Sequence, residues 1–587
     1  MKLARYSGVV VAVTVALLSG CSSGDKTADG SKNIAASAGD TEFAKLSDEI
    51  VQDFLKRHPA SATDFGLHAY DSDVEDVSQA GVQSAVAAIK GFQSRVAAVD
   101  TVGLSAANRL DRELLTHALD YGVLSYDVIK RWAMDPDIYS SNATNGAYVI
   151  MRRPFAPAID RLKSLIARER KMPAALLEAR KNLSNPPKIF TEIALDQIDG
   201  NISFFRKDLP AAFLEVTDST LLKEFRRVND SVMVALGEYK KWMQHDLLPK
   251  SNGSFAYGAD TYARALMATE MIDTPLDGLL KMAEENLAQN EAAFQAAAKR
   301  IDSTKTAPQV LAMLELDHPA ADKLLEATQA TLDSLRQFLI DKHIITIPID
   351  APPARVLETP PFMRATTSAS METPGPLETV KMDARYNMTL PDPRTSKAEQ
   401  EEFMHQWYYA LMSNVSVHEV YPGHYTQFLN SKNFPSITRS LFSANTNAEG
   451  WAHYSEQMML DEGFHNNDPK YRVAQMQDAL LRNVRFIVGI RMHTQGMTVD
   501  EATRMFQEKA HQVKPVAVSE AKRGTSDALY GYYTMGKLGI LKLRDEYKSE
   551  MGAQYSLQQF HDEFIKLGPL PLPLIRKAML GEKGQVF

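Results

Sequence analysis

Two histidines and a glutamate in the segment VHEVYPGHY, residues 417–425, are of the types that hold and use a metal ion. His418 and His424 offer imidazole nitrogens, and Glu419 places a carboxylate directly after the first of them. In many zinc hydrolases two histidines bind the metal and the glutamate between them acts as general base. The second histidine usually follows the first by four residues, whereas here it follows by six, so the backbone between them decides whether they can share an ion.

On an uninterrupted helix, residues six apart point about 120° away from each other, which is too divergent for two ligands of one zinc ion. Pro422 stands four residues after His418, so it removes the amide that would bond the His418 carbonyl. Gly423 then tolerates positive φ. We therefore expect a helix over about residues 406–420 to end there and a Pro-Gly turn to bring His424 back towards His418. The alternative is a plain helix end with a surface histidine.

A third ligand must come from elsewhere, because catalytic zinc usually has three protein ligands and one water. Cys21 is the only cysteine, so any zinc here is held by nitrogen and oxygen. A helix beginning near Asn445 would carry Glu449, His453 and Glu456 along one face. Glu449 is our preferred ligand and His453 its competitor, while a solvated acidic face is the alternative reading.

These residue types predict hydrolysis of an acyl bond. Glu419 would take a proton from the attacking water and pass it to the leaving amine. The developing oxyanion needs a hydrogen-bond donor, and the tyrosine-rich segment from residue 530 offers Tyr530, Tyr532 and Tyr533. Tyrosines in an apolar helix also serve packing, so the residues alone leave the choice among the three open.

The elements that must position these residues are mostly helices. Apolar residues recur every three or four positions in the clearest examples, which are residues 43–58, 111–129, 161–183 and 276–301. Residues 344–390 instead contain short β-branched or alternating runs between prolines, which indicate a few strands. We predict a mainly α fold with a small β element there. Residues 41–587 would form one large domain, with the metal-site segment at 400–545.

The N-terminus resembles an export signal for a lipoprotein. Residues 1–20 combine two basic residues with a short apolar run, and the sequence Leu-Ser-Gly before Cys21 resembles a bacterial lipobox. Residues 21–40 are small and polar and would form a flexible tether. We expect attachment to the membrane only through a lipid on Cys21. The expected place is the bacterial cell envelope, on the periplasmic face of the outer membrane if the cell is Gram-negative.

The charge balance argues against nucleic acid as a partner. The formal net charge is -8 at pH 7, and the sequence contains no basic stripe that could neutralise phosphates. The partner we expect is a peptide or another small acyl substrate.

Several motifs together resemble one bacterial family. The segment HEVYPGH with Gln427, and EGWA from Glu449 with Tyr454, resemble the family called domain of unknown function 885. The similarity extends to three further stretches, which are HPASATDFGLHAYD (58–71), RGTSDALYGYYTMGKLGILKLR (523–544) and FHDEFIKLGPLPL (560–572).

That resemblance implies a helical fold like that of zincin-type, oligopeptide-cleaving metallopeptidases. It implies Zn²⁺ as the cofactor, Glu419 as general base and Tyr533 facing the reacting carbonyl; the implied zinc ligands are His418, His424 and Glu449. Arg523 and His493 match recurring family positions, for which substrate-carboxylate binding or support of the ligands are the hypotheses.

The function predicted from sequence is a zinc-dependent peptidase that hydrolyses short peptides in the cell envelope. Two alternatives stay open, a metal-dependent amidase acting on something other than peptides and a binding lipoprotein without catalytic activity. Identical zinc chemistry serves any acyl bond, so the residues do not separate the peptidase from the amidase.

Overall fold

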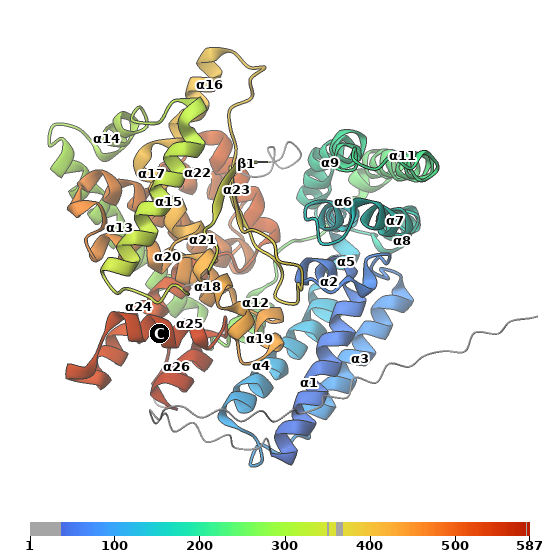
Figure 1. The fold of residues 1–587 in the computed structure, drawn as a ribbon, viewed down its shortest axis with the longest axis horizontal. Helices are drawn as coiled ribbons and strands as arrows, with labels where there is room; N and C mark the ends of the chain where they lie inside the picture. Colours follow the sequence, from blue (N-terminus) through green and yellow to red (C-terminus); the bar gives the residue numbers. More distant parts are fainter. Residues whose placement is uncertain (1–36, 349–350, 360–367, 583) are drawn as a thin grey trace, which may run out of the picture.

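The computed structural model describes residues 37–348, 351–359, 368–582 and 584–587, and most of these are helical (Figure 1). The prediction of a mainly α fold with a small β element is therefore confirmed. The signal segment 1–20 and Cys21 lie outside the described residues. Among the described helices, none is both long and apolar enough to cross a bilayer.

The chain begins with helices that carry serine caps. Ser37, Ser78 and Ser105 accept hydrogen bonds from the first turns of α1 (Ala38–Arg57), α3 (Gln79–Ala97) and α4 (Ala106–Leu124). The predicted tether at 21–40 is therefore too long at its end, because the Ser37 cap starts α1 at Ala38. The short helix α2 (Pro59–Phe65) follows α1 and ends in the left-handed Gly66.

A second group of helices has its own apolar core and lies beside the first group in Figure 1. It contains α6 (Asp137–Met151), α7 (Ala158–Glu169), α8 (Met172–Asn182), α9 (Lys188–Ser203) and α11 (Ser219–Trp242). The single helix predicted over 161–183 is wrong. The chain breaks between α7 and α8, and Pro173 occupies the first turn of α8, where its missing amide costs nothing.

The C-terminal half forms a bundle around one long buried helix, α21 (Pro469–Thr494), which packs against α13 (Leu276–Ile301). Beside it α20 (Asn445–Asp461) crosses α24 (Tyr532–Met551) at very short range. A Cβ atom at Gly536 would lie 2.0 Å from the Thr446 carbonyl oxygen and 2.5 Å from the Gly450 Cα. Glycine on both helices therefore permits the crossing.

A small sheet covers part of this bundle. Its strands are β1 (Arg355–Glu358), β2 (Ala369–Glu372) and β3 (Arg385–Met388), in the order β1-β3-β2. Strand β3 is parallel to β1 and antiparallel to β2. Within the region 344–390, where strands were expected, the isoleucine- and threonine-containing residues 345–348 form no strand.

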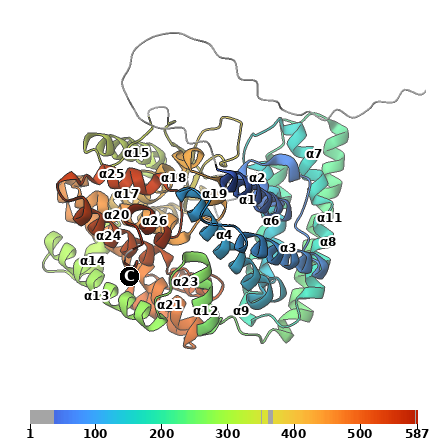
Figure 2. The ribbon, with the colours of Figure 1, turned by 90° about the horizontal axis from the view of Figure 1, so that it is seen from below.

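Several helices remain besides those named so far, and Figure 2 shows the whole arrangement from below. They are α5 (Arg131–Met134), α10 (Leu209–Ala211), α12 (Ala259–Glu270), α14 (Ala307–Leu314), α15 (Leu324–Asp341), α16 (Lys397–Met404), α17 (Tyr409–Glu419), α18 (His424–Leu429), α19 (Ile437–Leu441), α22 (Val499–Lys509), α23 (Lys514–Ser526), α25 (Leu557–Lys566) and α26 (Leu572–Leu580).

Candidate metal centre

The two histidines lie at adjoining helix ends. Helix α17 ends at Glu419 and α18 begins at His424, so the helix stops where Pro422 predicts. The imidazole rings of His418 and His424 have their centroids 4.9 Å apart and are nearly perpendicular. The six-residue spacing is thus compatible with two histidines that bind one metal ion.

The role of Gly423 differs from the expected one. Its φ is -65° and its ψ is -133°, so the turn uses no positive φ. Instead, a Cβ atom at this position would lie 1.8 Å from the carbonyl oxygen of His418. The Gly423 amide donates a hydrogen bond to the Val417 carbonyl at 3.0 Å. Glycine is therefore needed for close approach of the backbone to the end of α17.

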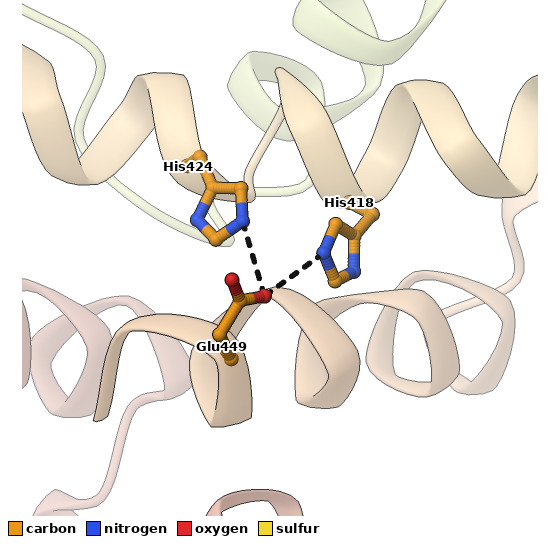
Figure 3. Close-up of side chains that lie close together, drawn as sticks. All are labelled: His418, His424 and Glu449. Carbon is orange, nitrogen blue, oxygen red and sulfur yellow. Dashed lines mark ion pairs between the residues drawn. The ribbon is translucent and has the colours of Figure 1, made fainter. Parts of the chain in front are cut away.

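Glu449 of α20 completes a group of three possible ligands (Figure 3). Its Oε2 atom lies 3.3 Å from Nε2 of His418 and 3.4 Å from Nε2 of His424. Zinc–ligand bonds of about 2.0–2.1 Å in a tetrahedron place neighbouring ligand atoms about 3.3–3.4 Å apart, so the spacing fits zinc. The same Oε2 atom is buried and has no hydrogen-bond partner among the described residues. An ion between the three atoms would satisfy it.

The second nitrogen of His418 is fixed by a buried carboxylate. Its Nδ1 atom lies 2.7 Å from Oε1 of Glu456, and Arg482 lies 3.1 Å from the same oxygen. A histidine that donates Nδ1–H to a carboxylate keeps the Nε2 lone pair free for a metal. Burial alone would lower the pKa of His418, but the neighbouring carboxylates of Glu449 and Glu456 outweigh this and raise it to about 10. The cluster therefore strongly favours positive charge at its centre.

His453, the competing ligand, lies on the other side of Glu456. Its Nδ1 atom contacts Oε2 of Glu456 at 3.1 Å, and it is not part of the three-ligand group. Burial lowers its pKa to about 3, so the imidazole is neutral near pH 7. Two glutamates of the acidic face predicted on α20 therefore differ in position. Glu449 points to the candidate metal position, and Glu456 contacts the candidate ligand His418.

Glu419 is half-buried at the last position of α17. Tyr386 on β3 lies close enough for its pKa to be raised first by burial and then by the Glu419 carboxylate. The small sheet therefore forms one wall beside the expected general base.

Of the three candidate tyrosines, Tyr533 lies against a ligand. Its ring centroid is 6.3 Å from that of His418, and the guanidinium groups of Arg482 and Arg485 lie 5.5 and 5.2 Å from its ring. Tyr532 instead bonds the Asp527 carboxylate at 3.2 Å, and Tyr530 is fully buried. Tyr533 thus has the best position of the three to act at the site.

Two residues carry only a family-based expectation, and of these Arg523 lies beside Tyr533 whereas His493 is buried deeper. Arg523 pairs with Asp527 at 2.9 Å and also donates to the Tyr532 hydroxyl. His493 is buried, contacts the Gly524 carbonyl at 2.8 Å and packs on Tyr257. His493 is therefore placed to hold α21 against α23, and both residues stand outside the three-ligand group.

Arg482 and Arg485 lie beside the candidate centre, and the sequence alone did not identify them. Both lie in the buried middle of α21, and Arg485 pairs with Glu520 at 2.7 Å. Arginines directly before the apolar run 486–490 are a usable signal, because charges are rarely buried without a partner.

Comparison with known proteins gives a family and a fold. The family model described as "Bacterial protein of unknown function (DUF885)" matches residues 59–579. A predicted lipoprotein of unknown function from Shewanella oneidensis has a similar structure, with a TM-score of 0.78 and 26% identity, covering 92% of this chain and 99% of that one.

A predicted lipoprotein from Colwellia psychrerythraea has the same TM-score of 0.78 and the same coverage of 92% and 99%, at 17% identity. No curated protein matches the chain in sequence. Since the family model spans most of its length, this chain belongs to the DUF885 family of bacterial proteins of unknown function.

Proposed function

We propose that this protein is a zinc-dependent peptidase that hydrolyses short peptides. The observation that carries the proposal is the convergence of two imidazole nitrogens on one buried carboxylate oxygen, at 3.3 and 3.4 Å, with a second glutamate next to the first histidine. Three protein ligands of the histidine-histidine-glutamate type are typical of catalytic zinc with an open fourth position.

When bound, zinc acts as a Lewis acid that polarises a carbonyl and lowers the pKa of a water molecule from about 15.7 towards about 7. Side chains of the protein would transfer the protons, stabilise the oxyanion and orient the metal ligand. Glu419 accepts a proton from the attacking water and delivers it to the leaving nitrogen. Tyr533 donates a hydrogen bond to the carbonyl oxygen as negative charge develops on it. Glu456 and Arg482 hold His418 in the orientation that the metal needs.

The place of action that we propose is the cell envelope. The lipobox-like sequence before Cys21 supports attachment by a lipid, and both structural relatives are described as predicted lipoproteins. Radiolabelled palmitate incorporation that is lost in a Cys21→Ser variant tests this assignment. Equal incorporation in the variant would contradict it.

The decisive experiment on the function compares the wild type with Glu419→Gln. Substituting the carboxylate should lower the hydrolysis of short peptides by about 10²–10⁴-fold, because a general base is lost. Bound zinc, measured by metal analysis, should stay near one ion per chain. Full activity in the variant would remove Glu419 from the mechanism. If the wild type binds zinc but hydrolyses neither peptides nor other amides and esters, the protein is a binding lipoprotein.

A further inference from the structure

A large cavity lies between the N-terminal helices and the C-terminal bundle. Its volume is 560 Å³, within the range of about 300–1,000 Å³ that is typical of small-ligand sites. Helices α1, α3 and α4 form one wall. The opposite wall comes from α12, from the start of α20 and from residues 526–529 and 532.

Two separate elements connect this cavity to the candidate metal centre. Asn445 lines the cavity and precedes the ligand Glu449 by one helical turn on the same face of α20, an axial distance of about 6 Å. Tyr532 also lines the cavity, and its ring is 4.8 Å from that of Tyr533. The wall of the cavity thus reaches residues next to Glu449 and Tyr533, although neither of these two residues lines it.

The chemistry of the wall favours an uncharged, apolar occupant. Apolar side chains line much of it, among them Phe54, Phe92, Leu114, Phe442 and Leu529. Its acidic and arginine side chains are already engaged within the protein. Their partners are Asp53 for Arg57, Asp135 for Arg131, Arg523 for Asp527, and the backbone amides of Asn445 and Thr446 for Glu270.

We infer that this cavity is the substrate pocket and that it receives an aromatic or large aliphatic side chain next to the scissile bond. A charged side chain would lose hydration there while the carboxylates and arginines of the wall are already paired, whereas an apolar one gains about 25 cal/mol for each Å² that it buries. The inference rests on the proposed function for the bond that is cleaved, and it adds the class of peptide that the site selects.

The inference can be tested by introducing a larger side chain into the cavity at a residue that is not a candidate metal ligand. Ala118 on α4 lines the cavity, and Ala118→Phe should raise the KM for Ala-Phe-Ala at least tenfold while changing that for Ala-Ala-Ala much less. The matched control is Ala106→Phe, at an exposed position on the same helix, which should leave both values unchanged. Equal KM values for Ala-Phe-Ala in wild type and Ala118→Phe would overturn the inference.

A binding measurement separates this inference from the proposed function. Calorimetry on the zinc-loaded full chain carrying Glu419→Gln should show binding of Ala-Phe-Ala at least tenfold tighter than that of Ala-Ala-Ala, with the difference lost on adding Ala118→Phe. If the wild type cleaves neither peptide but this pattern appears, the pocket stands and the peptidase assignment falls. If neither peptide binds, the pocket assignment falls.

A second variant decides the matter if Ala118→Phe does not fold. Phe92 is half-buried in the wall on α3, and Phe92→Ala enlarges the cavity without touching the metal centre. It should shift the preference from Ala-Phe-Ala towards Ala-Trp-Ala by at least threefold in kcat/KM or in affinity. An unchanged preference would overturn the inference.

Discussion

At the residue scale, the buried carboxylate of Glu456 organises more of the centre than any of the three candidate ligands does. It contacts His418 and His453 through different oxygens and pairs with Arg482. Burial by itself raises the pKa of Glu456, but Arg482, His453 and the bonds from both histidines hold it well below the usual value. The carboxylate is therefore charged at neutral pH and fixes the tautomer of His418.

We expect Glu456→Gln to lower zinc affinity by about 10–100-fold, the usual effect of losing a carboxylate behind a ligating histidine. Competition with a chromophoric chelator measures the change. Asp461→Asn, on the same helix at an exposed position, serves as the control and should bind zinc like the wild type. Unaltered zinc affinity in Glu456→Gln would show that the His418 orientation is fixed by other contacts.

Gly423 gives a second prediction at this scale. Gly423→Ala should reduce bound zinc severely, because the added Cβ would overlap the His418 carbonyl oxygen at 1.8 Å and must push the two histidines apart. Gly237→Ala is a suitable control, since its Cβ meets nothing within 4 Å and alanine stabilises a helix interior by about 0.5–1 kcal/mol. Zinc content per folded chain, checked by circular dichroism, is the measurement. Normal zinc content in Gly423→Ala would refute this account of the turn.

At the scale of elements, the crossing of α20 and α24 positions the candidate ligand Glu449 relative to Tyr533. Gly450 is next to Glu449 on one helix, and Gly536 is one turn after Tyr533 on the other. Because the two backbones meet at these glycines, the ligand and the proposed oxyanion donor lie on facing surfaces. The crossing distance thus sets the geometry of the site.

Gly536→Ala should destabilise the protein by about 1–3 kcal/mol or more, because a methyl group at 2.0 Å from the Thr446 carbonyl oxygen forces the helices apart. Peptide hydrolysis should fall further than the loss of folded protein explains, as Tyr533 moves from the ligands. Urea unfolding and activity per folded chain test both parts. Gly278→Ala, whose Cβ would meet only the Thr274 methyl group at 3.5 Å, is the control. Stability equal to the wild type would contradict the argument.

The sequence could predict features that depend on local backbone chemistry. Pro422 ends α17 through its own missing amide and ring. The start of α20 at Asn445 was also predicted, but its first amides are capped by Glu270 of α12 and not by a local side chain. Partnerships across the fold could not be predicted in this way. The pairing of Arg482 with Glu456 depends on how α21 packs on α20. The break before α8 has a local signal in Pro173, which the apolar periodicity through residues 161–183 masked.

At the scale of the whole molecule, contacts between distant segments connect the N-terminal helices to the sheet beside Glu419. The Leu377 amide donates to the Phe65 carbonyl at 2.9 Å, and Gly375 packs on the backbone of Asp64 and Phe65. His68 adds a polar bridge, with Nδ1 3.1 Å from Asp71 and Nε2 3.1 Å from Glu378. The segment after these contacts continues directly into β3.

The His68 bridge should make folding stability depend on pH. Burial lowers the pKa of His68, but the bonds and charges of Asp71 and Glu378 outweigh it and raise the pKa above 6.5. The stabilisation is therefore fully present below about pH 6.5 and is lost as the pH rises through the folded pKa.

We expect the free energy of unfolding of the wild type to exceed that of His68→Gln at about pH 6, and the difference to shrink by about pH 8.5. Urea unfolding at both pH values measures it, and His245→Gln, at an exposed position, should behave like the wild type. A difference that stays constant or grows with pH would mean that His68 is neutral in the folded protein and that this bridge is held by uncharged hydrogen bonds.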